Sequence, residues 1–281
     1  SSTTKRALDS KDSPYVVEVI FTTPTAVDIE HMRKNEDVKH FEYAFKIETV
    51  FQLGGAFRRH KRLAVFDMDS TLIQQEVIDE IAAKIGVQSE VAAITERAMN
   101  GELDFEGSLR QRCGLLAGVS SNVWEELKSV ITLSPGAQDL VRALKRLGYK
   151  TAVLSGGFTP LATWLAGELG LDYVHANHLV VSEDGQTLTG ELTGDIVHAE
   201  RKRDLVREIA AKEGITLSQV LTVGDGANDL PMLGIAGLGV AFNAKPRVQE
   251  LAPTRLNTSS LFDVLYLLGF SRVERQELLS S

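Results

Sequence analysis

Short, continuously apolar runs alternate with stretches of helical periodicity over most of the chain after residue 62. The apolar runs occupy residues 63–66, 151–154, 220–223 and 238–242. Amphipathic helices are indicated at residues 77–85, 89–99, 123–130, 136–147 and 202–212. Because strands that are apolar on both faces must be covered on both sides, this alternation predicts an α/β fold with a doubly wound, Rossmann-like parallel sheet.

Polar or glycine-rich residues directly follow three of these runs. Asp67 follows the first run, Ser155-Gly156-Gly157 the second and Gly224-Asp225-Gly226 the third. Ligands of open α/β sheets bind at the carboxyl ends of the strands, so we expect these residues to line one crevice. The stretch between the first two runs is too long for a single crossover, and its helices predict a cap inserted over the crevice.

These patterns divide the chain into four expected parts. They are an N-terminal α/β segment at 1–60, an α/β core formed by 61–75 and 131–270, a helical cap at 76–130 and a C-terminal tail at 271–281. The distribution of charge supports the first boundary. Residues 1–60 hold nine basic and nine acidic side chains, so the net charge of −8 falls entirely on the remainder.

The N-terminal segment is expected to fold as a strand, a helix and a second strand. Residues 15–21 are rich in β-branched and aromatic side chains, and residues 41–51 alternate between apolar and polar positions. The second strand could pair with another copy of the chain in a homodimer, or pack against its own chain. We interpret the basic run at 58–62 as a solvated linker rather than as a localisation or phosphate-binding patch.

Composition restricts the class of protein. The chain has 281 residues, 43% of them hydrophobic, which argues against disorder. Its 38 acidic residues outnumber 30 basic ones, which disfavours nucleic acid as a partner. No apolar run approaches the roughly 18–20 residues that would cross a bilayer, so we expect no membrane association. The single cysteine, Cys113, cannot form an internal disulfide, and a reducing, cytoplasmic location is the simplest expectation.

Acidic residues at the strand ends form the most informative pattern. Asp67 and Asp69 are two residues apart, and Asp225 and Asp229 reach the same predicted edge of the sheet. Acids gathered in one crevice repel each other unless a cation neutralises them, and oxygen ligands favour a hard ion such as Mg²⁺. Any single one of these motifs also fits a turn or a helix N-cap. Their occurrence at three strand ends makes a shared site the better interpretation.

These motifs resemble those of the haloacid dehalogenase superfamily. The resemblance rests on Asp67-x-Asp69-x-Thr71, Ser155-Gly156-Gly157, a downstream lysine and the run from Gly224 to Asp229. It covers about residues 62–268, and stretches at 67–76, 95–112 and 241–246 are similar to the members that hydrolyse O-phospho-L-serine. Residues 1–60 carry no such signature. Some relatives have an N-terminal regulatory-type α/β module, which this segment could represent in abbreviated form.

The resemblance implies Mg²⁺-dependent hydrolysis of O-phospho-L-serine, the last step of L-serine biosynthesis. Asp67 would be the nucleophile and form an aspartyl-phosphate. Asp69 would protonate the leaving oxygen and then deprotonate the attacking water. Mg²⁺ would be held by the Asp67 carboxylate, the Asp69 backbone carbonyl and Asp225. Asp229 would orient these ligands without binding the metal itself.

The resemblance also assigns groups to the two ends of the substrate. Ser155, the Gly156 amide and Lys202 would bind the phosphate, although the neighbours Arg201 and Arg203 leave a shift of one residue open. Other residues would contact the rest of the substrate or the attacking water: Glu76 the ammonium group, Arg112 the carboxylate, Asn228 the substrate or the water, and Met99 and Phe105 as an apolar wall.

Two other functions fit the same residues. An alcohol could replace water as the phosphoryl acceptor, which would make the protein a phosphotransferase. A phospho-ligand sensor without catalysis is the third possibility, but it would be favoured by loss of Asp67, Asp69, Lys202 or Asp225, and all four are present. The role of residues 1–60 and feedback by serine stay open at this stage.

Overall fold

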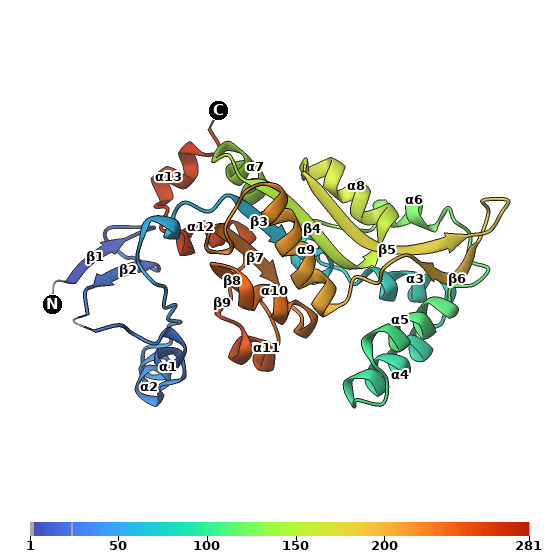
Figure 1. Cartoon of the computed structure of the whole chain (residues 1–281), viewed down its shortest axis with the longest axis horizontal. Coiled ribbons are helices and arrows are strands. Elements are labelled where there is room, and N and C mark those ends of the chain that lie inside the picture. The colour runs from blue at the N-terminus through green and yellow to red at the C-terminus, as the bar shows by residue number, and fades with distance from the viewer. Residues whose placement is uncertain (1–2, 24, 281) are drawn as a thin grey trace.

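A computed structural model describes residues 3–23 and 25–280, apart from the side chain of Met99 (Figure 1). Its centre is a seven-stranded sheet in the order β6-β5-β4-β3-β7-β8-β9. Six of these strands are parallel, and β6 is antiparallel to β5 at one edge. The predicted parallel sheet is therefore confirmed, with one antiparallel strand added. The strands are β3 (Leu63–Phe66), β4 (Lys150–Phe158), β5 (Tyr173–Val181), β6 (Leu188–Thr193), β7 (Val220–Gly224), β8 (Leu238–Phe242) and β9 (Thr254–Leu256).

Helices cover both faces of the sheet, and the central strand β3 shows why. Ala64 and Phe66 belong to one buried cluster, while Leu63 and Val65 belong to the other. Successive side chains of a strand point to opposite faces, so both faces must be covered by apolar helices. The helices of the core are α7 (Ala137–Arg146), α8 (Thr159–Leu169), α9 (Ala199–Lys212), α10 (Leu230–Ile235), α11 (Pro246–Leu251) and α12 (Val264–Leu267), and α13 (Arg272–Glu277) follows them.

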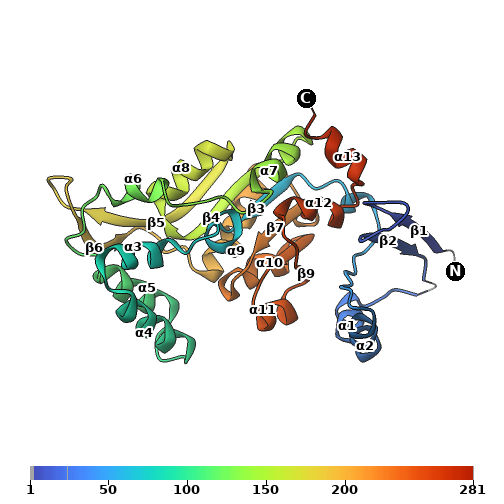
Figure 2. The same ribbon diagram turned by 180° about the vertical axis from the view of Figure 1, so that it is seen from behind.

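Four helices are inserted between β3 and α7. They are α3 (Val77–Ile85), α4 (Gln88–Met99), α5 (Phe105–Gly114) and α6 (Val123–Lys128). The insertion lies beside the β5–β6 hairpin, at the end of the molecule opposite the N-terminal segment (Figures 1 and 2). The Gly118 amide donates to the Leu188 carbonyl at 2.8 Å, which fastens the insertion to that hairpin. Its two connections to the core run side by side, since Ile73 and Leu133 form an antiparallel bridge.

The N-terminal segment packs against the C-terminal end of the chain. Strands β1 (Thr3–Ala7) and β2 (Val17–Phe21) form an antiparallel pair, followed by helices α1 (Ile29–Lys34) and α2 (Glu36–Phe45). The Arg272 amide donates to the Leu8 carbonyl at 2.6 Å, and Leu8 is buried. The expected strand at 15–21 is found as β2, but β1 was not predicted because its sequence TTKRA has no apolar alternation.

The predicted strand at 41–51 is wrong, because its first half belongs to helix α2. The Asn35 side chain caps this helix by accepting from the Asp37 amide at 2.8 Å. Phe41 and Phe45 are four residues apart, so one helix face brings their rings together, with centroids 4.9 Å apart. A strand needs a neighbour for its backbone hydrogen bonds, whereas a helix pairs them internally. The predicted strand through which a homodimer could have formed is therefore helical in its first half and forms no strand in its second half.

The interpretation of residues 58–62 as a solvated linker is also wrong in part. Arg58 forms an ion pair with Glu18 of β2, and Arg59 pairs with Glu274 at 2.7 Å. Lys61 is buried, and its Nζ donates to a backbone carbonyl at 2.7 Å. These basic side chains fasten the N-terminal segment and β3 to neighbouring elements. Within the described residues, no helix has the length and apolar character needed to span a membrane.

Candidate active site

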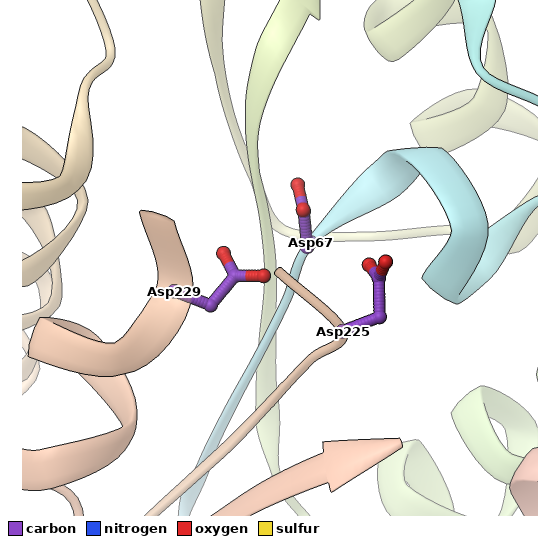
Figure 3. Close-up of side chains that lie close together, drawn as sticks. All are labelled: Asp67, Asp225 and Asp229. Carbon is purple, nitrogen blue, oxygen red and sulfur yellow. The ribbon is translucent and has the colours of Figure 1, made fainter. Parts of the chain in front are cut away.

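Three carboxylates converge where β3 and β7 end. Asp67 follows β3 directly, and its amide donates to the Val223 carbonyl of β7 at 2.9 Å. Asp225 lies in the loop after β7, and Asp229 ends the short helix at Ala227–Asp229. Carboxylate oxygens of the three residues lie within 4.8 Å of one another (Figure 3). Residues from separate parts of the chain thus form one acidic cluster, as the strand endings predicted.

Lys202 on α9 is the cation buried beside this cluster. Its side chain is 0% exposed, and its Nζ lies 2.8 Å from Oδ1 of Asp67 and 2.7 Å from Oδ1 of Asp229. Burial by itself lowers the pKa of Lys202, but the two carboxylates outweigh burial and hold that pKa above its ordinary value. Arg201 pairs instead with Glu208, and Arg203 pairs with its neighbour Asp204. Only Lys202 among these three consecutive basic residues therefore faces the acidic cluster.

The hydrogen bonds of the acidic cluster leave two oxygens for a further ligand. Both oxygens of Asp229 are used, one by Lys202 and the other by the Gly226 amide at 3.0 Å. Oδ1 of Asp67 accepts from the Met68 amide and from Lys202. Oδ1 of Asp225 accepts from Thr71 Oγ1 at 3.0 Å. Oδ2 of Asp67 and Oδ2 of Asp225 are not used by these contacts.

The electrostatics of the cluster suit a bound cation. Burial raises the pKa of Asp67 well above its ordinary value, and the nearby charge of Asp229 raises it further. Burial and Asp229 likewise raise the pKa of Asp225, to about 6. Lys202 pairs with only Asp67 and Asp229 of the three carboxylates, so a divalent cation on their remaining oxygens would relieve both the repulsion and the loss of hydration. The donor set is oxygen only, which favours a hard ion.

Asp69 lies beside the cluster but in a different environment. Its Oδ1 is buried without a hydrogen-bond partner in the described part of the chain. Burial raises the pKa of Asp69 well above its ordinary value, and the charge of Glu76 adds to this effect. A raised pKa makes a carboxyl group better able to hold a proton and deliver it as a general acid. Asp67, which is held by Lys202, and Asp69, which is not, are therefore suited to different roles.

The stretch from Ser155 to Gly157 lies inside β4 rather than after it. The strand continues to Phe158, with a shift in its pairing register with β5 between Leu154 and Phe158. Ser155 is buried, and its Oγ accepts from the Gly157 amide at 2.8 Å. Asp69 Oδ2 lies 3.2 Å from the point where a Cβ on Gly157 would stand. The expected contact between the Ser-Gly-Gly stretch and the acidic residues is thus present.

Further predicted residues come from the inserted helix α5, from the residue before α3 and from the short helix after β7. Phe105 of α5 and the Asn228 side-chain amide approach Gly156, at 3.4 and 4.0 Å from the position of a Cβ there. Glu76 accepts from Ser70 Oγ at 2.7 Å, and its charge acts on Asp69. Arg112 of α5 is half-buried, and Glu76 is among the charged groups that act on it. The side chain of Met99, the other half of the predicted apolar wall, lies outside the described residues.

Two contacts involve residues to which the sequence analysis gave no role. Thr71 holds Asp225, and Ser70 holds Glu76. Ser70 has a φ of 53°, a left-handed conformation that is uncommon for residues other than glycine. Thr71 is part of the quoted motif, so its position was a signal for a role. Nothing local in the sequence marks Ser70 as the partner of Glu76.

The parallel sheet and the acidic site at its edge are typical of one class of hydrolases. The family model for haloacid dehalogenase-like hydrolases matches residues 64–234, and the chain belongs to that family. The matched residues include the acidic cluster and Lys202.

Within this family, the chain is similar to several phosphoserine phosphatases. The chain is 50% identical over 225 residues to the "Probable phosphoserine phosphatase" of Schizosaccharomyces pombe, covering 80% of this chain and 76% of that protein. It is 51% identical over 231 residues to the phosphoserine phosphatase of Streptomyces coelicolor, covering 82% of this chain but only 56% of that longer protein. A solved structure described as a phospho-aspartyl intermediate analogue of phosphoserine phosphatase matches with a TM-score of 0.68 and 43% identity, covering 73% of this chain and 98% of the other.

Proposed function

We propose that this chain hydrolyses O-phospho-L-serine to L-serine and inorganic phosphate. The observation that carries the proposal is the contrast between the two aspartates at the end of β3. Asp67 is paired with Lys202 at 2.8 Å and keeps Oδ2 for another partner, while Asp69 has no cationic partner among the described residues. A nucleophile beside a proton donor is what cleavage of a phosphate ester requires. The similarity to phosphoserine phosphatases supports the choice of substrate.

In the first half of the reaction, the Asp67 carboxylate attacks the phosphorus atom through the oxygen that does not hold the metal, and forms an aspartyl-phosphate. The bond between phosphorus and the serine oxygen breaks, and Asp69 donates its proton to that oxygen. Lys202 lowers the pKa of Asp67 against the effect of burial and holds the carboxylate in place. The Ser155 hydroxyl and the Gly156 amide donate hydrogen bonds to the phosphoryl oxygens, where negative charge gathers in the transition state.

In the second half, water cleaves the aspartyl-phosphate. Asp69, now ionised, takes a proton from the water as its oxygen attacks phosphorus, and the bond to Asp67 breaks. Inorganic phosphate leaves, Asp67 returns as a carboxylate, and Asp69 is protonated again for the next cycle. Asn228 approaches Gly156 and is placed to orient the substrate or this water.

Mg²⁺ is the proposed cofactor. Asp67 Oδ2, the Asp69 backbone carbonyl and Asp225 Oδ2 would hold it, with Asp229 orienting the cluster through Lys202 and the Gly226 amide. When bound, the ion would supply positive charge beside the phosphoryl oxygens and offset the repulsion among the acids.

The inserted helices would select the amino-acid part of the substrate. Glu76 would bind the ammonium group, and Arg112 would bind the carboxylate through two parallel hydrogen bonds. Phe105 would cover the bound substrate on its apolar side. In this proposal residues 76–130 are a cap over the core formed by 61–75 and 131–270, while 1–60 and 271–281 flank it.

A phosphate-release assay on O-phospho-L-serine, O-phospho-L-threonine and sugar phosphates tests the proposal. We expect Mg²⁺-dependent release that is strongest for phosphoserine, and its loss in Asp67→Asn after mass spectrometry has excluded deamidation back to aspartate. Equal rates on all three substrates would contradict the specificity and leave the phosphatase activity standing. Phosphate release from phosphoserine by the Asp67→Asn protein, or transfer of the phosphoryl group to an added alcohol in preference to water, would contradict the mechanism itself.

A further inference from the structure

The side chain of Asn177 joins two segments that carry the proposed phosphate-binding groups. Asn177 lies on β5 and is 1% exposed. Its Nδ2 donates to the Gly156 carbonyl at 2.7 Å, and its Oδ1 accepts from the Val197 amide at 2.8 Å. Val197 lies in the loop before α9, five residues ahead of Lys202. One amide group therefore connects the strand of Ser155 and Gly156 to the helix of Lys202.

The hydrogen bond from Asn177 to Gly156 affects the Ser155 hydroxyl through the peptide group between Gly156 and Gly157. Pairing between β4 and β5 shifts after Leu154 and resumes where Phe158 lies opposite Asn177. Such an irregularity leaves backbone groups without their usual partners. Asn177 binds the carbonyl of the peptide between Gly156 and Gly157, and the N–H of that peptide donates to Ser155 Oγ at 2.8 Å. The orientation of this peptide thus depends on Asn177 and sets that of Ser155.

The contact to Val197 acts on the first turn of α9. Val197 is buried, and the next residue, His198, accepts the Lys202 amide through its carbonyl at 2.8 Å. The start of the helix is therefore anchored one residue after the Asn177 contact. Because Lys202 Nζ must meet Asp67 at 2.8 Å, a displacement of this turn would move the cation relative to the nucleophile.

We propose that Asn177 is a positioning residue that sets the spacing between Ser155-Gly156 and Lys202 around the phosphoryl group. The inference rests on the proposed function, which assigns these groups to the phosphate. In this proposal Asn177 acts through its two backbone partners and not by contact with the substrate. Its effect should therefore fall on the phosphate end of the site and not on the amino-acid end at Glu76 and Arg112.

The variant Asn177→Asp removes the donor to Gly156 and keeps an acceptor for Val197. We expect kcat for O-phospho-L-serine to fall roughly 10- to 100-fold, as for other small displacements of groups around a reacting centre. The dissociation constant of inorganic phosphate, measured by calorimetry with Mg²⁺ present, should rise about tenfold, corresponding to one lost hydrogen bond. Inhibition by L-serine should stay within about twofold, since Glu76 and Arg112 are untouched.

Thr151→Val is the matched control. Thr151 is buried on β4, and its Oγ1 donates to Asp172 at 2.9 Å, just before β5. The change removes a side-chain hydrogen bond between the same two strands at the end away from the site. It should lower the melting temperature without weakening phosphate binding. Asn177→Ala removes both contacts without adding a buried charge, and takes the place of Asn177→Asp if that variant does not fold.

The outcomes separate positioning from a purely structural role. Unchanged phosphate binding in a folded Asn177 variant, or an equal loss in Thr151→Val, would overturn the inference. Calorimetric binding of phosphate does not depend on turnover. If the wild-type protein bound phosphate but did not hydrolyse phosphoserine, the proposed substrate would be wrong while the test of Asn177 would still hold.

Discussion

Removing the charge of Lys202 tests the electrostatic account of the site most directly. Lys202→Met keeps a side chain of similar length and removes the ammonium group. Nζ lies 2.8 Å from Asp67 and 2.7 Å from Asp229, and the lysine is 0% exposed. At an effective dielectric constant of about 20, each pair represents about 6 kcal/mol of gross attraction, much of which is spent on desolvation.

The variant should therefore be markedly less stable. Breaking a buried ion pair by removing one partner lowers the free energy of unfolding by about 3–5 kcal/mol, because the remaining charge is left buried and unpaired. The loss should be largest above pH 7 and shrink as the pH falls. Lys202 lowers the pKa of Asp67 against the effect of burial, so without Lys202 this carboxyl group takes up a proton at a higher pH than in the wild type. As the pH falls, protonation removes the unpaired buried charge of the variant, and its deficit in stability relative to the wild type decreases. The phosphatase rate should fall by at least about 100-fold.

Urea unfolding at pH 7.5 and pH 5.5, with Arg203→Met as control, measures this effect. Arg203 lies next to Lys202 on α9 but pairs with Asp204 at the surface, so its loss should leave stability and rate close to those of the wild type. A Lys202→Met protein as stable as the control, or one whose deficit did not shrink at pH 5.5, would refute the view that Lys202 balances two buried carboxylates.

Two further predictions concern the cation and the cap. Mg²⁺ should raise the melting temperature more at pH 7.5 than at pH 5.5, because protons compete with the ion below the Asp225 pKa of about 6. Scanning calorimetry measures this shift, and an equal shift at both pH values would argue against an acidic metal site. Arg112→Met should raise the KM for phosphoserine roughly 10- to 100-fold, the loss expected for a charged hydrogen bond. The KM for O-phosphoethanolamine should stay unchanged, because this compound has no carboxylate. An equal rise in KM for both substrates would show that Arg112 does not bind the carboxylate.

Local sequence patterns predicted the elements of the core well where residues are apolar because they are buried. β3 and β8 have the predicted bounds, and α3 begins and ends where its periodicity indicated. These strands are apolar at every position because both faces of the sheet are covered. The same reasoning failed at 41–51, where apolar residues are largely exposed and a helix cap at Asn35 decided the conformation. Alternation is informative only where one face is buried.

The sequence by itself determined which residues follow the central strands, and therefore that acids and glycines meet at one edge of the sheet. Only the tertiary structure decided which of three consecutive basic residues enters the site. Arg201, Lys202 and Arg203 have similar local surroundings in the chain, and the direction of each side chain depends on how α9 packs against the sheet. The role of Asn177 was hidden for the same reason, because its partners at Gly156 and Val197 lie about 20 residues away in either direction. Periodicity reports burial along one segment, whereas a hydrogen bond between segments depends on their packing in three dimensions.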